Sequence, residues 1–159
     1  MIFVTVGSQM AFDRLIGAMD GWTAAQSDAP EVFAQIGPSA LRPAAMRWSV
    51  ALTPQEFDAA VDAASVIVAH AGMGSVLTAM EKGKVLVLMP RLGERQETRN
   101  DHQVATARWL ASREGIFIAM DEHELPAVLA TARAASARTA RIAPYASDRL
   151  IEALRGFVG

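Results

Sequence analysis

Residues 66–80 read VIVAHAGMGSVLTAM, which is an apolar strand, a turn with two glycines and the first turns of a helix in direct succession. Bare N–H groups at the start of a helix carry partial positive charge, and glycine allows an anion to come close to them. The stretch therefore predicts an α/β unit with an anion-binding turn where the strand passes into the helix.

The composition limits the size of the fold and the kinds of partner. The chain has 159 residues, of which 52% are hydrophobic, enough for about one domain with a sheet buried on both faces. Lys and Arg number 15 against 17 Asp and Glu, so the formal net charge of -2 provides no basic field to attract nucleic acid. RNA and DNA are therefore not expected as partners.

The absence of cysteine excludes disulfides and thiolate metal sites, and it fits a reducing compartment, so a cytoplasmic location is expected. Residues 1–6 lack the basic region of a signal sequence, and no apolar run reaches the roughly 18 residues of a membrane-spanning helix. Any membrane contact is expected to be peripheral or to be made through a partner.

Six short apolar runs alternate with helical patterns along the chain. Strands that are apolar throughout are typical of a parallel sheet covered on both faces. With right-handed crossovers they predict an open α/β sheet with helices on both faces and all strand carboxyl ends at one edge. The predicted strands are Ile2–Val6, Val32–Ile36, Trp48–Leu52, Val66–Ala69, Val85–Met89 and Ile116–Ala119.

Capping patterns and apolar stripes mark the helices. Three segments, which begin at Thr53, Asn100 and Asp121, place a capping side chain three residues before Glu or Gln. Two stripes at helical spacing are predicted to face the core. They consist of Phe12, Leu15, Ile16, Met19 and Trp22, and of Leu125, Val128, Leu129 and Ala132.

Three loops are expected to meet at the carboxyl edge of the sheet and to form a ligand site: Gly7–Gln9, His70–Ser75 and Arg91–Gln103. The glycine turn lacks the third glycine of a dinucleotide fingerprint, because Leu77 stands there, and no Gly-Lys-Ser/Thr follows a glycine loop. A nicotinamide cofactor and an ATPase phosphate cradle are therefore disfavoured. Phosphate binding and tight packing both remain explanations for the two glycines.

The charged loop after the fifth strand has two interpretations. Arg91, Arg95 and Arg99 form either a solvated, mobile surface or a clamp for a diphosphate or carboxylate. His70 and His102 lie where an imidazole can donate to a phosphate oxygen.

The sequence offers neither a metal site nor a nucleophile. Two histidines without spaced carboxylates make a poor set of metal ligands, and no Asp-x-Asp pair is present to hold a magnesium-bound diphosphate. Ser8 and Ser75 are interpreted as hydroxyl donors at turn or helix starts. An enzyme built on this pattern works by positioning its substrate and by stabilising a leaving group.

Six motifs follow one another over almost the whole chain: Phe3–Gln9, Phe12–Ile16, His70–Ser75, Gly83-Lys84, Met89-Pro90 and Asn100–Gln103. In this order they resemble the C-terminal, donor-binding half of glycosyltransferase family 28. The nearest similarity is to small soluble subunits of split enzymes, namely bacterial exopolysaccharide subunits of the glucuronosyltransferase type. The cytosolic subunit of the eukaryotic lipid-linked N-acetylglucosaminyltransferase is similar as well.

The resemblance implies a Rossmann-like domain equivalent to the C-terminal half of a GT-B glycosyltransferase, with a UDP-sugar as substrate and neither cofactor nor metal. Thr78 stands where the peptidoglycan-forming relatives have an acidic residue that holds the ribose. His102 and Gln103 are expected to approach the transferred sugar. The implied donor-binding residues are Gly7, Ser8, Gln9, His70, Ala71, Gly72, Met73, Gly74, Ser75, Thr78, Arg91, Asn100, Asp101, His102 and Gln103.

Complete enzymes of this architecture bind donor and acceptor between two domains, whereas residues 1–159 correspond to a single UDP-sugar-binding domain. The resemblance implies an inverting transfer to a polyprenyl-diphosphate-linked saccharide. The acceptor site and the general base are expected on a separate membrane-anchored subunit, which recruits this chain to the inner face of the membrane. A helix at about residues 146–158 either docks that subunit or closes its own core.

The sequence leaves the donor sugar and the role of the domain open. Pairing of Arg91 or Arg99 with a carboxylate suits glucuronic acid, but N-acetylglucosamine and glucose are alternatives. A nucleotide-sensing module without chemistry, or a scaffold that stabilises a membrane partner, would use the same edge of an α/β sheet.

Overall fold

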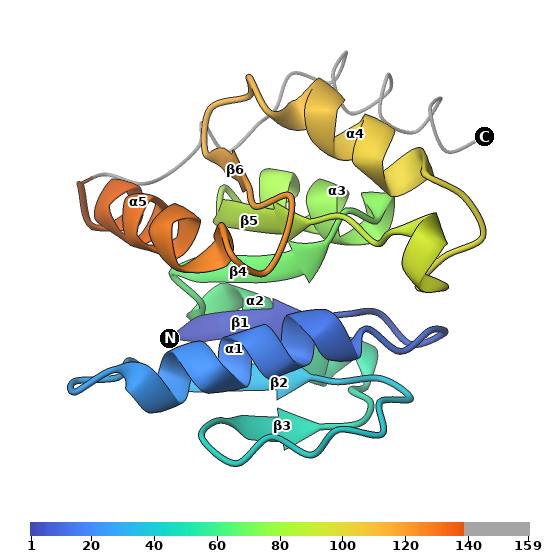
Figure 1. Ribbon diagram of the computed structural model, residues 1–159. Coiled ribbons are helices and arrows are strands. Elements are labelled where there is room, and N and C mark those ends of the chain that lie inside the picture. The colour runs from blue at the N-terminus through green and yellow to red at the C-terminus, as the bar shows by residue number, and fades with distance from the viewer. Residues whose placement is uncertain (139–159) are drawn as a thin grey trace.

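The computed structural model describes residues 1–138, which are arranged around one six-stranded sheet of parallel strands (Figure 1). The strand order is β3-β2-β1-β4-β5-β6, which confirms the predicted open parallel sheet. The strands are β1 (Ile2–Thr5), β2 (Val32–Gln35), β3 (Arg47–Ser49), β4 (Val66–His70), β5 (Val85–Met89) and β6 (Ile116–Ile118). The α-helices are α1 (Asp13–Ala25), α2 (Pro54–Ala63), α3 (Met73–Glu81), α4 (His102–Leu110) and α5 (Leu125–Arg138), and a short 3-10 helix, η1, spans Gly93–Arg95.

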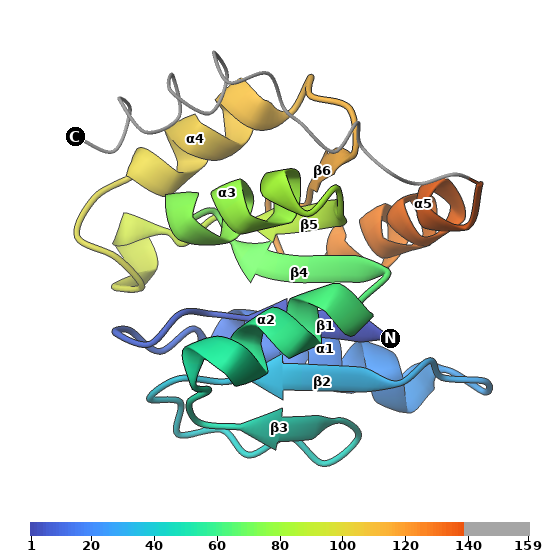
Figure 2. The ribbon, with the colours of Figure 1, turned by 180° about the vertical axis from the view of Figure 1, so that it is seen from behind.

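The central strands are buried on both faces because successive side chains point to opposite layers. Val4 and Val68 pack on one face beneath α1 and α5 (Figure 1), whereas Phe3 and Ile67 pack on the other face. The view from behind shows α2, α3 and α4 covering that second face (Figure 2). Apolar strands without alternation are therefore what this two-sided burial requires.

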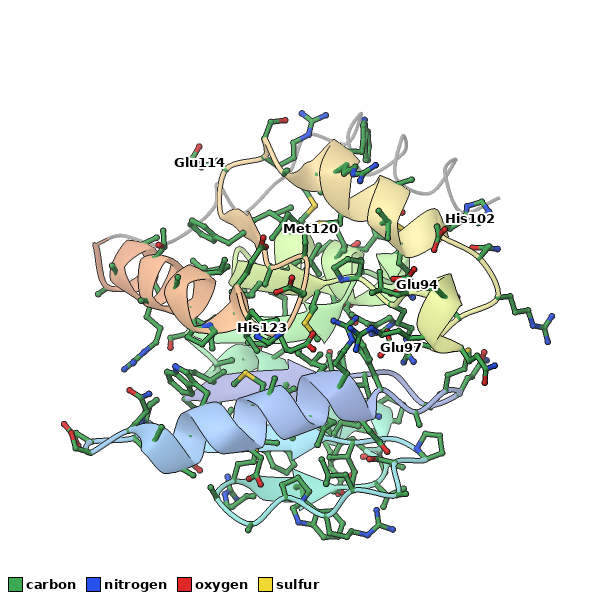
Figure 3. All side chains as sticks on the ribbon, viewed as in Figure 1. Glu94, Glu97, His102, Glu114, Met120 and His123 are labelled. Atoms are coloured by element: carbon green, nitrogen blue, oxygen red, sulfur yellow. The ribbon has the colours of Figure 1, made fainter. Side chains whose placement is uncertain are left out.

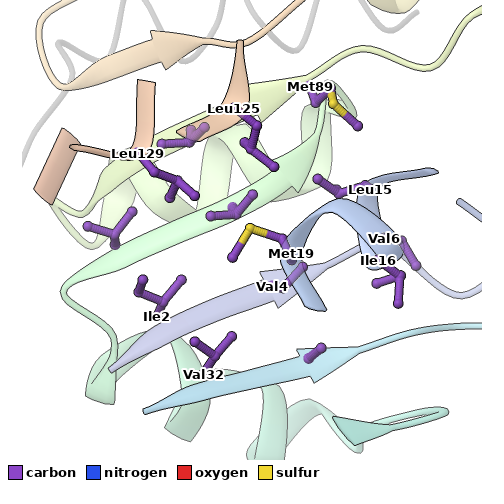
Figure 4. Close-up of a cluster of buried hydrophobic side chains, with 14 of the residues drawn as sticks. Ile2, Val4, Val6, Leu15, Ile16, Met19, Val32, Met89, Leu125 and Leu129 are labelled. Carbon is purple, nitrogen blue, oxygen red and sulfur yellow. The ribbon is translucent and has the colours of Figure 1, made fainter. Parts of the chain in front are cut away.

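The predicted apolar stripes of the first and last described helices are confirmed. Leu15 and Met19 of α1 and Leu125 and Leu129 of α5 are fully buried and meet above the same face of the sheet (Figure 4). The spacing of three and four residues places them on one side of each helix. Both helices thus contribute to a single core layer.

The third strand departs from the prediction. The observed β3 spans only three residues, Arg47–Ser49, and within the described residues it pairs with β2 alone. Arg47 is exposed and Trp48 is 38% exposed, so this strand is not buried on both faces. An edge strand lies beyond the helical cover, and a charged residue on it prevents further strand pairing.

Two of the three predicted helix starts keep their caps. Thr53 and Glu56 form a complete capping box, with hydrogen bonds of 3.2 and 2.8 Å between side chain and main chain. The Asp121 carboxylate accepts from the Glu124 N–H at 3.0 Å, but the Glu124 side chain reaches back to the N–H of Met120. The pattern that begins at Asp121 is thus a variant of the capping box, and α5 begins just after it.

The sheet order changes direction at β1, which has β2 on one side and β4 on the other. In open α/β sheets, ligands bind beyond the carboxyl ends of the strands at such a switch point. Gly7, which follows β1, has a φ of +74°, and Gly37, which follows β2, has a φ of +60°. The two loops come into close contact at this edge, because the main chain at Gly37 lies against the Gly7 carbonyl group.

Among residues 1–138, none of the helices has both the length and the apolar character needed to cross a bilayer. The helix predicted at about residues 146–158 lies outside the described residues. Its role in docking a partner subunit stays a prediction.

Gly37 and Gly21 give a matched test of the contact between the two loops. A Cβ at Gly37 would lie 2.9 Å from the carbonyl oxygen of Gly7, and its positive φ disfavours a side chain as well. A Cβ at Gly21, inside α1, would meet no atom within 4 Å. Denaturant unfolding should show a loss of about 1–3 kcal/mol for Gly37→Ala and a gain of about 0.5–1 kcal/mol for Gly21→Ala. Equal stability of the two variants would contradict this arrangement.

Candidate functional site

Two neighbouring hollows open at the carboxyl edge of the sheet, and both are lined by Gly7, Ser8 and His70. The first hollow has a volume of about 270 Å³ and the second about 420 Å³. The first is also lined by Val6, Gln9, Met10, Arg91, Thr98 and Gln103. The second is also lined by Thr5, Gln35, Phe57, Gly74, Ser75 and Thr78.

The amino end of α3 faces the second hollow through Gly74 and Ser75. The helix begins after Gly72 with no side-chain cap from any described residue and no acidic residue in its first turn. Its first N–H groups are thus available to a negatively charged ligand. A Cβ at Gly74 would meet no protein atom within 4 Å, so the approach to these N–H groups is open.

His70 lies between the two hollows, and its imidazole accounts for the absence of a side chain at Gly7 and at Gly72. Its imidazole packs so closely on Gly72 that a Cβ there would collide with Nε2. On its other side, a Cβ at Gly7 would lie 3.3 Å from the His70 Cε1. Gly7 of the first loop and Gly72 of the turn thus allow tight packing around the imidazole, whereas Gly74 leaves the start of α3 open.

The His70 imidazole is neutral at physiological pH. Burial and the positive charge of Arg91 lower the pKa of His70 to about 4, although the main chain of Thr5 partly opposes this shift. Its Nδ1 is buried and has no hydrogen-bond partner among the described residues. A neutral imidazole carries one N–H donor and one acceptor nitrogen, and it keeps this form across the pH range of the cell.

A buried polar pair beneath the second hollow was not predicted from the sequence. The Thr5 hydroxyl donates to the Gln35 side-chain oxygen at 2.7 Å, and both residues occupy paired positions at the ends of β1 and β2. The Gly7 N–H contacts the Thr5 hydroxyl at 3.4 Å. A polar residue at the end of each of two adjacent apolar strands is the signal that could have indicated this pair. Met10, Phe57 and Thr98 also line the hollows and were not predicted.

Arg91 is not part of a solvated surface, which was one of the two interpretations of its loop, and the described contacts of its guanidinium are with main-chain oxygens. Its guanidinium is buried, 3% exposed, and donates to the carbonyl oxygens of Val6, Met10, Ala11 and Glu97 at 2.7, 2.9, 2.7 and 3.3 Å. These bonds direct the guanidinium toward the main chain. Its role is to connect two loops of the site.

The loop before α4 is held by side chains that were predicted to bind the donor. Asn100 accepts from the His102 N–H at 3.0 Å, and Asp101 accepts from the Gly93 N–H at 3.2 Å. Gln103 accepts from the Arg91 N–H at 3.0 Å through its side-chain oxygen, so the predicted Asn100–Gln103 capping box is not formed. Its side-chain amide group is left to serve the first hollow.

The predicted site residues divide into two groups. Gly7, Ser8, Gln9, His70 and Gly74 line the hollows, as do Ser75, Thr78, Arg91 and Gln103. The other predicted residues do not line the hollows: Ala71 and Met73 pack in the core, Gly72 supports His70, Asn100 and Asp101 hold the loop, and His102 is exposed (Figure 3).

Thr78 takes part in the helix as well as in the second hollow. Its hydroxyl donates to the Gly74 carbonyl at 2.9 Å, one turn earlier in α3. The hydroxyl oxygen keeps acceptor capacity for a ligand hydroxyl. As for metals, residues 1–138 contain no group of three His, Asp or Glu side chains that could hold an ion.

Comparison with known proteins identifies the family of the chain. The model of the glycosyltransferase family 28 C-terminal domain matches residues 1–145. No significant match was found among curated protein sequences.

Several solved structures share the fold. They include the glycotransferase of kitacinnamycin (TM-score 0.58, 20% identity, 98% of this chain and 37% of that chain). MurG of Acinetobacter baumannii is also similar (TM-score 0.60, 19% identity, 97% of this chain and 49% of that chain). So is the spinosyn forosaminyltransferase SpnP (TM-score 0.56, 16% identity, 99% of this chain and 44% of that chain). The chain thus spans less than half the length of these structures.

The low pKa of His70 leads to a prediction about stability. Between pH 6.5 and about 4 the unfolded chain binds a proton at His70 that the folded chain does not, so the free energy of unfolding falls as the pH falls through this window. The loss attributable to His70 is at most about 3 kcal/mol. Denaturant unfolding at several pH values should show a flatter profile for His70→Asn, whereas His123→Asn, at an exposed position, should follow the unmodified protein. Identical profiles for all three proteins would be evidence against a neutral, buried His70.

Proposed function

Because the chain belongs to the glycosyltransferase family 28 C-terminal domain family, we propose that it binds the UDP-sugar donor of an inverting, metal-independent glycosyltransferase. The observation that carries this proposal is the uncapped start of α3, which opens into the hollow lined by Ser8, Gly74 and Ser75. The diphosphate of the donor binds at these N–H and hydroxyl groups. A sugar nucleotide is thus held by its most highly charged part.

Sugar transfer places increasing negative charge on the departing diphosphate. N–H groups that are already oriented toward that charge stabilise the transition state more than the ground state. The helix start and the neutral imidazole of His70 provide such donors without a metal ion. This domain therefore contributes leaving-group stabilisation, and it contributes no nucleophile.

The two hollows divide the donor between them. The second hollow holds the nucleoside side of the diphosphate, where Thr78 is available to a ribose hydroxyl. The first hollow holds the sugar, where the side-chain amide of Gln103 can donate to a hydroxyl or carboxylate oxygen. His102 approaches the sugar only if the loop before α4 closes over the donor.

The acceptor is a polyprenyl-diphosphate-linked saccharide in exopolysaccharide synthesis. Its binding site and the general base belong to a membrane-anchored partner subunit, which recruits this chain from the cytoplasm to the inner face of the membrane. The resemblance to subunits of split enzymes supports this arrangement, and the donor hollows lie at the carboxyl edge of the sheet, where an acceptor-binding unit could approach them.

Donor binding can be tested with two valine substitutions. Calorimetry with UDP is expected to show binding to the unmodified chain and a loss of at least tenfold, about 1.4 kcal/mol, for Gly74→Val, whose side chain fills the approach to α3. Gly21→Val is the matched control, because a Cβ there also meets no atom. If UDP bound equally to both variants, the proposed diphosphate site would be wrong.

The identity of the donor sugar can be tested by calorimetry that compares the affinities for UDP-glucuronic acid, UDP-N-acetylglucosamine and UDP-glucose. We expect UDP-glucuronic acid to bind most tightly, because the resemblance to glucuronosyltransferase subunits agrees with the donor amide of Gln103 in the first hollow. Gln103→Glu should reverse that preference by placing a carboxylate against the uronate. Tightest binding of UDP-N-acetylglucosamine would assign the other transferase class.

The partner requirement can be measured separately. The purified chain should bind the donor but transfer no labelled sugar to a lipid-linked saccharide, since the base and the acceptor site are supplied by the partner. Membranes that contain the partner should restore transfer when the chain is added. Steady transfer by the purified chain alone would contradict the two-subunit arrangement.

A further inference from the structure

The guanidinium of Arg91 connects the two ends of one short loop segment. It donates to the carbonyl of Val6, just before Gly7–Gln9, and to the carbonyls of Met10 and Ala11, just after it. These three acceptors lie 2.7, 2.9 and 2.7 Å away. The segment Gly7–Gln9 therefore lies between two anchored ends, and it lines the first hollow.

We propose that Arg91 is a positioning residue for the donor diphosphate, because it holds Gly7–Gln9 in the binding shape and places a buried positive charge beside the hollow. This inference rests on the proposed function. It assigns to Arg91 an action through the loop, in place of the direct clamp that was one of two interpretations of the sequence. Arg91 contacts main-chain oxygens, and the loop contacts the ligand.

A second set of contacts fixes Arg91 itself. Its guanidinium lies 4.8 Å from the centre of the Phe12 ring, and the guanidinium of Arg14 lies 5.4 Å from the same ring. Glu97 joins the two arginines, since its carbonyl accepts from Arg91 at 3.3 Å and its carboxylate pairs with Arg14 at 3.0 Å. Figure 3 labels Glu97 at this junction between α1 and the loop after β5. The loops after β1 and β5 are thereby held together.

The planar fork of arginine suits this role. Five N–H donors in one plane can reach several carbonyls at once, whereas a lysine ammonium offers three donors from a single point. The carboxylate of Glu97 is engaged by Arg14 and by the Leu92 N–H, so it only partly offsets the charge of Arg91. Burial lowers the pKa of Arg91, yet a guanidinium in a protein stays protonated.

The positive charge of Arg91 also acts on His70, which lines the same hollow. Arg91 disfavours protonation of His70, which is one of the two causes of the low pKa of that imidazole. A positive charge that disfavours an imidazolium at this place favours an anion there. Geometry and charge thus point to one role for Arg91.

The test compares Arg91→Met, Arg91→Lys and the control Arg133→Met, which removes an arginine that lies 5.6 Å from the Trp22 ring, away from both hollows. UDP affinity is measured by calorimetry, and the pKa of His70 is measured by NMR in the ligand-free protein. We expect Arg91→Met to weaken UDP binding at least about tenfold and to raise the pKa of His70. Arg91→Lys should leave the pKa of His70 near its original value and weaken UDP binding by a smaller factor, and Arg133→Met should change neither.

The outcomes separate this inference from the function on which it rests. An unmodified chain that does not bind UDP would overturn both. Normal UDP binding together with unchanged affinity in Arg91→Met would overturn only the role of Arg91, as would an unchanged pKa of His70. If Arg91→Met does not fold, Arg91→Lys decides: UDP affinity equal to that of the unmodified chain overturns the inference, and weaker binding with faster amide exchange in residues 7–9 supports it.

Discussion

Burial of a parallel sheet on both faces is the constraint on which this structure depends. Parallel neighbours can be joined only by crossovers that return over a face, so each strand sends its carboxyl end to the same edge. Two layers of helices then exclude water from the strands, and polar chemistry is confined to the loops at their ends. The order of the strands changes at β1, and the loops after β1 and β4 diverge from that point and leave room for a ligand between them.

Much of this arrangement was predictable because the residues that decide it act locally. The apolar runs of β1, β4 and β5 and the stripes of α1 and α5 need only sequence spacing to be recognised. The third strand was mispredicted because its position at the edge depends on tertiary structure, and Trp48 there faces solvent in part. Apolar character alone does not distinguish a central strand from an edge strand.

The candidate site was predictable in place and only partly in mechanism. A glycine turn before a helix predicts an anion site, and His70, Gly74 and Ser75 of that turn line the same hollow. The role of Arg91 could not be found in the sequence, because three of its four carbonyl partners lie 80 or more residues away along the chain. A sequence shows that a side chain is charged, but it does not show whether that charge faces a ligand or the main chain. The distinct reasons for Gly7, Gly72 and Gly74 likewise emerge only when the imidazole between them is placed.

Three groups of the site complement one another: the start of α3, the imidazole of His70 and the guanidinium of Arg91. The partial positive charge of helix N–H groups is strongest close to the helix end, a neutral imidazole adds a polar group without charge, and a buried guanidinium adds a charge that no proton transfer removes at physiological pH. Since burial, together with the charge of Arg91, keeps the pKa of His70 low, the imidazole does not gain charge as the pH varies around neutrality. A departing diphosphate would therefore meet the same preoriented donors at each turnover. Such constancy is what leaving-group stabilisation without a metal requires, because the stabilising groups must be in place before the charge develops.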